Sequence, residues 1–197
     1  MRIGVVDYGS GNLKSIYNFL FNNFTSDICT YTDSVAGLDT CNVLILPGVG
    51  HFGLASKQLI NNGLFSEIKQ FASSGKPLLG VCLGAQLLTE SSEEAPGSMG
   101  LGLIKTYCSS LEGFSDYSGR VPRIGWSRLS TDSQHAYYFV HSYYIVDSGN
   151  QDCIYYKCED GVTGMVEHKN ILAMQFHPEK SDKSGLSIVK NFLDLHV

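Results

Sequence analysis

One cysteine lies in a setting that suits a nucleophile. Residues 80–84 read Gly-Val-Cys-Leu-Gly, directly after the apolar residues 77–79 and directly before the helix-like stretch 85–88. This order predicts a strand, a tight turn with Cys82 at its apex and then a helix, the elbow with which α/β enzymes display a nucleophile. The flanking glycines let the strained turn pack without side-chain clashes, and the start of a helix favours a thiolate. We therefore predict that Cys82 attacks an electrophile.

A thiolate nucleophile usually needs a histidine that accepts and returns a proton, and a third group that orients the histidine. Among the six histidines, His177 has the best surroundings, in the run Gln-Phe-His-Pro-Glu at residues 175–179. Pro178 holds the backbone of His177 extended, and Glu179 can fold back to accept the ring N–H and fix the tautomer. The alternative is an exposed loop with a solvated histidine and glutamate. The cysteine elbow in the same chain favours the catalytic interpretation.

Residues 47–50, Pro-Gly-Val-Gly, could supply the next part of such a site, an oxyanion hole. They follow the apolar run 42–46, and their two glycines would let backbone N–H groups point into a crevice. An ordinary turn is one alternative, and the tetrapeptide alone does not separate the two. A phosphate-binding loop is another alternative, which the lack of a Walker lysine after these residues argues against.

The first half of the chain alternates strand-like and helix-like segments. We expect strands at residues 2–7, 27–30, 42–46 and 78–81, and helices at 12–23, 52–61, 65–74 and 83–90. The second half predicts short strands at residues 121–124, 136–140, 143–146, 154–157, 163–168 and 172–175, and a last helix at 183–195. The pattern predicts an α/β fold with a doubly wound, mostly parallel central sheet and added antiparallel strands, in a single domain over residues 1–197. Sites in such sheets form at the carboxyl ends of the strands, which would bring residues 47–50 and Cys82 to one crevice.

Composition excludes several classes of protein. The chain has 197 residues, 43% of them hydrophobic, which is enough for a sizeable core, and its net charge of −5 disfavours a nucleic-acid surface. It has no apolar run of about 18 residues and no signal-peptide pattern, so we expect a cytoplasmic protein without a membrane span. The six cysteines lack the spacing of a metal site. We expect no disulfide framework, no metal and no cofactor.

Two segments of the chain resemble a known family. Residues 80–86 and 175–179 are similar to the two signature segments of class I (triad) glutamine amidotransferases, and their order along the chain makes the resemblance specific. Within that class, the chain resembles the glutaminase subunits of imidazole glycerol phosphate synthase, from histidine biosynthesis. The segments that support this closer resemblance are residues 7–13, 46–50, 125–126 and 138–143. The resemblance covers essentially the whole chain.

The resemblance implies a mechanism. Cys82 attacks the side-chain amide of glutamine, His177 protonates the departing ammonia and then activates water against the thioester, and Glu179 orients His177. The oxyanion is held by the backbone N–H groups of Leu83 and of Val49 or Gly50. The glutamine is held by Gln86, Glu94, Ser142 and Tyr143.

The resemblance also implies a partner. Members of the family dock on a (β/α)8-barrel cyclase or synthase subunit as a heterodimer, so that ammonia passes internally to the second active site. Ligand in the synthase switches the glutaminase on, and we expect reorientation of residues 47–50 to complete the oxyanion hole. We therefore expect this chain to hydrolyse glutamine poorly without its partner.

The chain departs from the family pattern at Arg123 and Ser127, and slightly at residues 180–185, which follow the His-Pro-Glu run. Arg123 and Ser127 replace the usual histidine and asparagine around the Gly-Trp pair, where we expect the synthase interface. This leaves open a paralogous amidotransferase subunit that supplies ammonia for the amidation of surface-polysaccharide sugars. A thiol hydrolase or peptidase of similar fold is a further alternative, which Gln86 and the His-Pro-Glu segment argue against. Cys82, His177 and Glu179 argue against a non-catalytic interaction protein.

Overall fold

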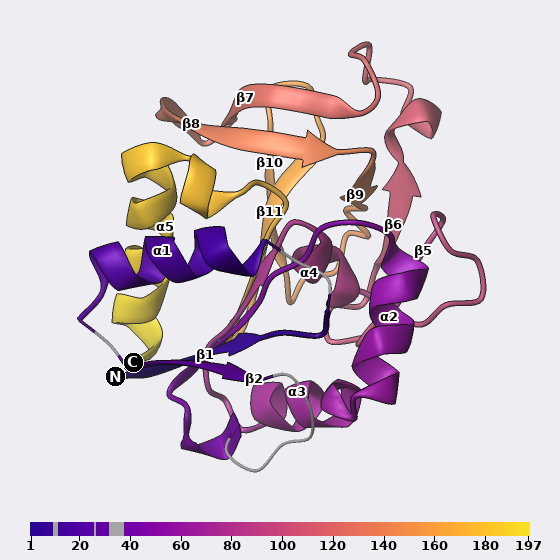
Figure 1. Cartoon of the computed structure of the whole chain (residues 1–197). Helices are drawn as coiled ribbons and strands as arrows, with labels where there is room; N and C mark the ends of the chain where they lie inside the picture. The colour runs from indigo at the N-terminus through magenta and orange to yellow at the C-terminus, as the bar shows by residue number, and fades with distance from the viewer. Residues whose placement is uncertain (10–11, 26, 32–37) are drawn as a thin grey trace.

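A seven-stranded sheet forms the centre of the computed structural model, which describes residues 1–9, 12–25, 27–31 and 38–197 (Figure 1). Its strands run in the order β10-β11-β12-β4-β3-β1-β2. In chain order they are β1 (Arg2–Val6), β2 (Asp27–Tyr31), β3 (Val43–Leu46), β4 (Leu78–Val81), β10 (Ile154–Lys157), β11 (Thr163–His168) and β12 (Ile171–Met174). Strands β2, β1, β3, β4 and β12 are parallel, β11 pairs antiparallel with β12, and β10 pairs antiparallel with β11 at the edge. The predicted mostly parallel sheet with added antiparallel strands is confirmed.

Helices cover both faces of this sheet, as a doubly wound fold requires. They are α1 (Leu13–Asn23), α2 (Phe52–Asn61), α3 (Leu64–Ser73), α4 (Leu83–Leu87) and α5 (Asp182–His196). Figure 1 shows α1 and α5 on one face of the sheet and α2 and α3 on the other.

The two faces carry separate hydrophobic cores because side chains alternate along each strand. In β3, Val43 and Ile45 pack with Ile16 and Leu20 of α1, whereas Leu44 and Leu46 belong to the core under α2 and α3. The spacing of the two α1 residues places them on one side of the helix, so the helix buries a single stripe.

Two small sheets lie outside the central one. The first has three strands, β5 (Ser91–Ser92), β6 (Tyr107–Ser110) and β9 (Tyr143–Ile145), and the second is a hairpin of β7 (Arg123–Leu129) and β8 (Asp132–His141). Sequence reasoning did not predict β5 or β6, and it ended β7 too early, at residue 124. Short strands at the edge of a domain lack the continuous apolar run that marks a central strand, so their pairing is decided by tertiary contacts.

Cysteine pairing, membrane-spanning helices and the segment 7–13 were also the subject of predictions. The five cysteines whose side chains the structure describes are free. No helix in the described part of the chain is long and apolar enough to cross a membrane. Two residues of the segment 7–13, at positions 10 and 11, lie outside the described residues.

Candidate active site

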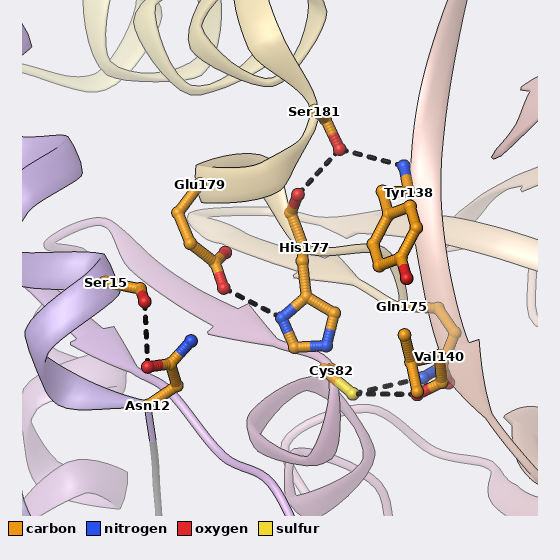
Figure 2. Close-up of polar contacts among 9 residues, drawn as sticks. All are labelled: Asn12, Ser15, Cys82, Tyr138, Val140, Gln175, His177, Glu179 and Ser181. Atoms are coloured by element: carbon orange, nitrogen blue, oxygen red, sulfur yellow. Dashed lines mark hydrogen bonds and ion pairs between the residues drawn. The ribbon is translucent and has the colours of Figure 1, made fainter. Parts of the chain in front are cut away.

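Three loops meet at the carboxyl edge of the central sheet. Residues 47–50 follow β3, Cys82 follows β4, and the segment 175–179 follows β12, and these three strands are neighbours in the sheet. Figure 2 shows Cys82 and His177 side by side at this edge, with Glu179 on the far side of the imidazole. The parallel pairing of β12 with β4 thus joins two segments that lie far apart in the sequence.

The backbone at Cys82 has the strained geometry predicted for an elbow. Its φ is 55° and its ψ is −111°, which a residue with a side chain rarely adopts, and its N–H donates to the carbonyl of Met174 at 2.8 Å. The glycines on either side are required by packing. A Cβ on Gly84 would collide with the carbonyl oxygen of Leu46, and one on Gly80 would lie 2.7 Å from Cα of Ala85. The strand and the turn therefore fix the position of the sulfur.

The helix after the elbow is shorter than predicted. It covers Leu83–Leu87 rather than residues 83–90, because the N–H groups of Leu88 and Thr89 bond to carbonyls three residues back and close the helix with a tight turn. A helix of this length carries a small macrodipole. Stabilisation of a thiolate at Cys82 must therefore come largely from side chains around it.

His177 and Glu179 form a buried pair. The ring Nδ1 lies 2.9 Å from Oε1 of Glu179, and the two side chains are 4% and 1% exposed. Figure 2 shows that the second ring nitrogen is on the side of Cys82. Burial lowers the pKa of His177, but the hydrogen bonds and charges of Cys82 and Glu179 outweigh it and raise this pKa to about 9. The imidazole can therefore hold a proton and return it to a group at the sulfur.

The loop that carries His177 is held by contacts that sequence reasoning did not identify. The N–H of His177 donates to the carbonyl of Tyr138 at 2.9 Å. The hydroxyl of Ser181 donates to the carbonyl of His177 at 2.6 Å and accepts from the N–H of Tyr138 at 2.9 Å. Figure 2 shows the two bonds of the Ser181 hydroxyl, which tie the loop to β8. They fix the ring relative to the sulfur, and only the tertiary approach of β8 could reveal them.

A cavity of about 300 Å³ opens in front of Cys82. Every residue predicted for the site lines it except Glu179, which lies behind the imidazole. The lining residues are Val49, Gly50, Cys82, Leu83, Gln86, Glu94, Pro122, Val140, His141, Ser142, Tyr143, His177 and Lys180. Its size suits a small molecule.

One of the predicted oxyanion donors, the N–H of Leu83, is not free in this structure. The N–H of Leu83 donates to the carbonyl of Gly48 at 3.3 Å. The carbonyl of the preceding Pro47 accepts from the buried Tyr8 hydroxyl at 3.0 Å, and Gly50 has a φ of 106°. The carbonyl of Gly48 would have to turn away before an oxyanion could use the Leu83 N–H. The residues predicted to form an oxyanion hole lie together at the cavity, but the Leu83 N–H is already occupied by the Gly48 carbonyl.

Glu94 lines the cavity, and its carboxylate also caps the first turn of α2. Its Oε2 accepts the N–H of Phe52 at 2.8 Å, and the next N–H, of Gly53, donates to Nδ1 of His51 at 3.1 Å. Residues 48–53 have the Gly-x-Gly-x-x-Gly spacing of a phosphate-binding loop, a pattern that sequence reasoning overlooked. The Glu94 carboxylate, however, occupies the helix start where a phosphate would bind. The structure therefore argues against the phosphate-binding alternative.

Arg123 and Ser127 lie on the inward side of β7, and the expectation of a synthase interface at this segment stays a prediction. Arg123 is only 8% exposed, and its Nη2 lies 2.7 Å from Oδ2 of Asp160 and 2.9 Å from Oγ of Ser127. Alternation along β7 turns both residues inward and leaves Ile124 and Trp126 on the exposed face. The two departures from the family pattern thus form an internal ion-pair cluster.

Comparisons with known proteins agree with this geometry. The family model described as glutamine amidotransferase class-I matches residues 4–195. The chain belongs to the class-I glutamine amidotransferase family. The subunit HisH of imidazole glycerol phosphate synthase from Sulfurimonas denitrificans is 40% identical, over 96% of each chain, and that from Methanothermobacter thermautotrophicus is 39% identical over 98% of each.

Solved structures of amidotransferases share the fold. A crystal structure of a glutamine amidotransferase superposes with a TM-score of 0.76 at 20% identity, covering 98% of both chains. The structure of PurLQS from Thermotoga maritima gives a TM-score of 0.71 at 18% identity, with the same coverage. The class-I glutamine amidotransferase fold of this chain is therefore shown both by sequence and by structure.

Proposed function

We propose that the chain is the glutaminase subunit of an imidazole glycerol phosphate synthase and hydrolyses glutamine to glutamate and ammonia for histidine biosynthesis. The observation that carries the proposal is the placement of Cys82, His177 and Glu179 around one cavity in a class-I amidotransferase. The full-length similarity to the HisH subunits supports the pathway. In this proposal residues 1–197 act as one glutaminase domain in the cytoplasm.

The first half of the reaction forms a thioester. The Cys82 thiolate attacks the carboxamide carbon of glutamine, and the C–S bond forms as the carbonyl becomes an oxyanion. His177 then gives its proton to the amide nitrogen, the C–N bond breaks, and ammonia leaves. The Glu179 carboxylate, at 2.9 Å from Nδ1, holds the ring and stabilises its charged form. These steps need no cofactor.

The second half of the reaction releases glutamate. His177, now neutral, takes a proton from water, and the hydroxide attacks the thioester carbon. The C–S bond breaks and the thiolate is restored, the imidazole keeps the proton that it took from water, and the new carboxyl group loses its proton to solvent. The high pKa of His177 favours this protonated state once the sulfur is charged.

A partner subunit regulates the oxyanion hole in this proposal. The Leu83 N–H is occupied by the carbonyl of Gly48, so the free chain lacks one of the donors that would stabilise the transition state. Binding of a (β/α)8-barrel synthase and of its ligand would turn residues 47–50 and expose the N–H groups of Leu83 and of Val49 or Gly50. The exposed side chain of Val49 lies within reach of such a partner.

The exposed face of the β7–β8 hairpin is the proposed docking surface. Ile124 and Trp126 are 63% and 53% exposed. Trp126 packs edge-on against Tyr138, and the ammonium of Lys180 lies over the same Tyr138 ring, 5.8 Å from its centroid. Because Lys180 also lines the active-site cavity, these contacts lead from the hairpin to the site of ammonia release. A partner on this face would therefore cover the exit.

The test measures glutamate release by the full chain alone, with a candidate barrel cyclase, and with that cyclase plus its ligand. We expect slow hydrolysis by the chain alone and stimulation of about 100-fold or more by the liganded complex, since oxyanion donors contribute factors of this size. Cys82→Ser should abolish the activity, whereas Cys153→Ser, outside the cavity, should retain it. Full activity of Cys82→Ser would refute the proposed mechanism.

The same assay separates the paralogous function. A sugar-amidating synthase replaces the cyclase in a parallel reaction, with its own acceptor as the ligand. Stimulation by that synthase and not by the cyclase would assign the chain to the paralogous branch, with the same triad. The internal Arg123 cluster gives no reason to prefer that branch, because it does not lie on the docking surface.

A further inference from the structure

We propose that Gln175 contacts the reacting sulfur and stabilises the Cys82 thiolate through its side-chain N–H. The inference rests on the proposed function and deepens it. Gln175 is 1% exposed, and its Nε2 lies 3.9 Å from Sγ of Cys82. Figure 2 shows the Gln175 amide on the opposite side of the sulfur from the imidazole. Gln175 and His177 are two positions apart in the segment that directly follows β12, so the segment that carries the base also carries this donor.

The direction of the Gln175 amide is determined by its neighbours. The carbonyl of Tyr143 can only accept, so Gln86 contacts it with its NH₂ group, at 2.8 Å. The same Nε2 of Gln86 lies 3.0 Å from Gln175, which must therefore present its oxygen there. The NH₂ group of Gln175 is left facing the sulfur. A backbone carbonyl thus orients both amides, and it makes the group at the sulfur a donor.

Two neighbours of the Cys82 sulfur favour different protonation states. The carbonyl of Val140, 3.7 Å from Sγ, can accept a hydrogen bond from the thiol but offers nothing to a thiolate. The NH₂ group of Gln175 donates, and a donor to an anion makes the stronger hydrogen bond. The elbow helix is only five residues long and its Leu83 N–H is occupied by Gly48. Gln175 and His177 are therefore the donors that the described structure provides to the sulfur.

A long N–H···S contact in the resting site is consistent with this role. Hydrogen bonds in unliganded active sites are often long and shorten when the charge develops. Gln86 couples the donor to the glutamine site, since Gln86 also lines the cavity. Gln86 is thus a positioning residue for Gln175.

The experiment measures the pH dependence of Cys82 alkylation by iodoacetamide in the full chain. The chain has six cysteines, and mass spectrometry of the peptide that contains Cys82 measures alkylation at this cysteine alone. Gln175→Met keeps the side-chain length and removes the donor. We expect the apparent pKa of alkylation to rise by about one unit, so that the rate at neutral pH falls about tenfold. A purely structural role would not shift the pH profile of a folded variant.

Two further variants keep the test decisive. Gln175→Asn shortens the side chain by one methylene, moves the NH₂ group away from the sulfur and should shift the profile in the same direction. This variant provides the test if Gln175→Met does not fold. Thr106→Val removes one buried hydrogen bond, to the carbonyl of Val146 at 2.6 Å, outside the cavity, and should leave the profile unchanged. An unshifted profile in folded Gln175 variants would overturn the inference.

Failure of the inference is distinguishable from failure of the proposed function. If Gln175→Met leaves the alkylation profile unchanged while Cys82→Ser abolishes glutaminase activity of the complex, the triad stands and Gln175 has no part in it. If Cys82→Ser retains activity, the proposed function itself is wrong, whatever the profile shows.

Discussion

At the scale of single residues, the buried pair of His177 and Glu179 determines how the site responds to pH. Both side chains are almost fully removed from solvent, and the pKa of His177 lies at about 9 against a reference value of 6.5. The imidazole therefore keeps its proton in the folded chain under conditions where the unfolded chain has lost it. Protonation of this residue is linked to folding.

This linkage predicts a loss of stability at alkaline pH. The contribution of His177 is fully present below pH 6.5 and is lost as the pH rises through about 9. Within that window the free energy of unfolding should fall by up to about 1.4 kcal/mol per pH unit, the value for one linked proton. Urea denaturation at a series of pH values measures the slope.

The control is Glu179→Gln, which keeps the shape of the side chain but removes its charge. The pKa of His177 should fall, and the alkaline loss of stability should become smaller. An equal loss in the wild type and in this variant would mean that the Glu179 carboxylate does not support the histidine charge.

At the scale of elements, the approach of α4 to β3 places the nucleophile. Gly84 allows the helix to pass directly over the carbonyl of Leu46, and the short loop that follows β3 supplies the carbonyl that closes the oxyanion hole. The same close contact brings the Leu83 N–H within 3.3 Å of Gly48. Packing of two elements thus sets both the position of the sulfur and the hydrogen bond that occupies the Leu83 N–H, a donor of the proposed oxyanion hole.

We predict that Gly84→Ala destabilises the fold by about 3 kcal/mol, because a methyl group there must displace backbone atoms. Gly113→Ala is the matched control, since a Cβ at Gly113 meets nothing within 4 Å. Denaturation midpoints of the two variants measure the difference. Equal stability of both would show that the elbow can shift without cost.

At the scale of the whole molecule, the β7–β8 hairpin leaves an apolar face beside the entrance of the cavity. Trp126 and Ile124 are exposed there, whereas the charged Arg123 on the same strand is turned inward. Exposed aromatic side chains of this kind commonly provide much of the binding energy of an interface. The exposed face of the hairpin is therefore the proposed contact surface for a partner subunit, while β8 also holds the loop of His177.

Trp126→Ala should weaken binding of the barrel subunit by about tenfold or more, in line with the loss of an aromatic anchor. The glutaminase activity of the saturated complex should change much less. Leu195→Ala, which truncates a side chain that is 81% exposed on α5, is the control and should bind normally. Titration calorimetry measures both affinities, and equal affinities would place the interface elsewhere.

The sequence by itself determined the parallel sheet, the elbow at Cys82 and the candidate pair of His177 and Glu179. These depend on apolar runs, glycine spacing and residues two positions apart, which are local properties of the chain. The elements that it missed, β5 and β6, pair only through distant contacts.

Only the tertiary structure decided three features of the site. The occupied N–H of Leu83, the donor of Gln175 at the sulfur and the inward turn of Arg123 all depend on groups that separate strands bring together. The direction of an amide or a carbonyl depends on which partner lies opposite, and the order of residues does not contain that information. For this reason the sequence could predict a nucleophile and its base, whereas the hydrogen bond that occupies the proposed oxyanion donor required the fold.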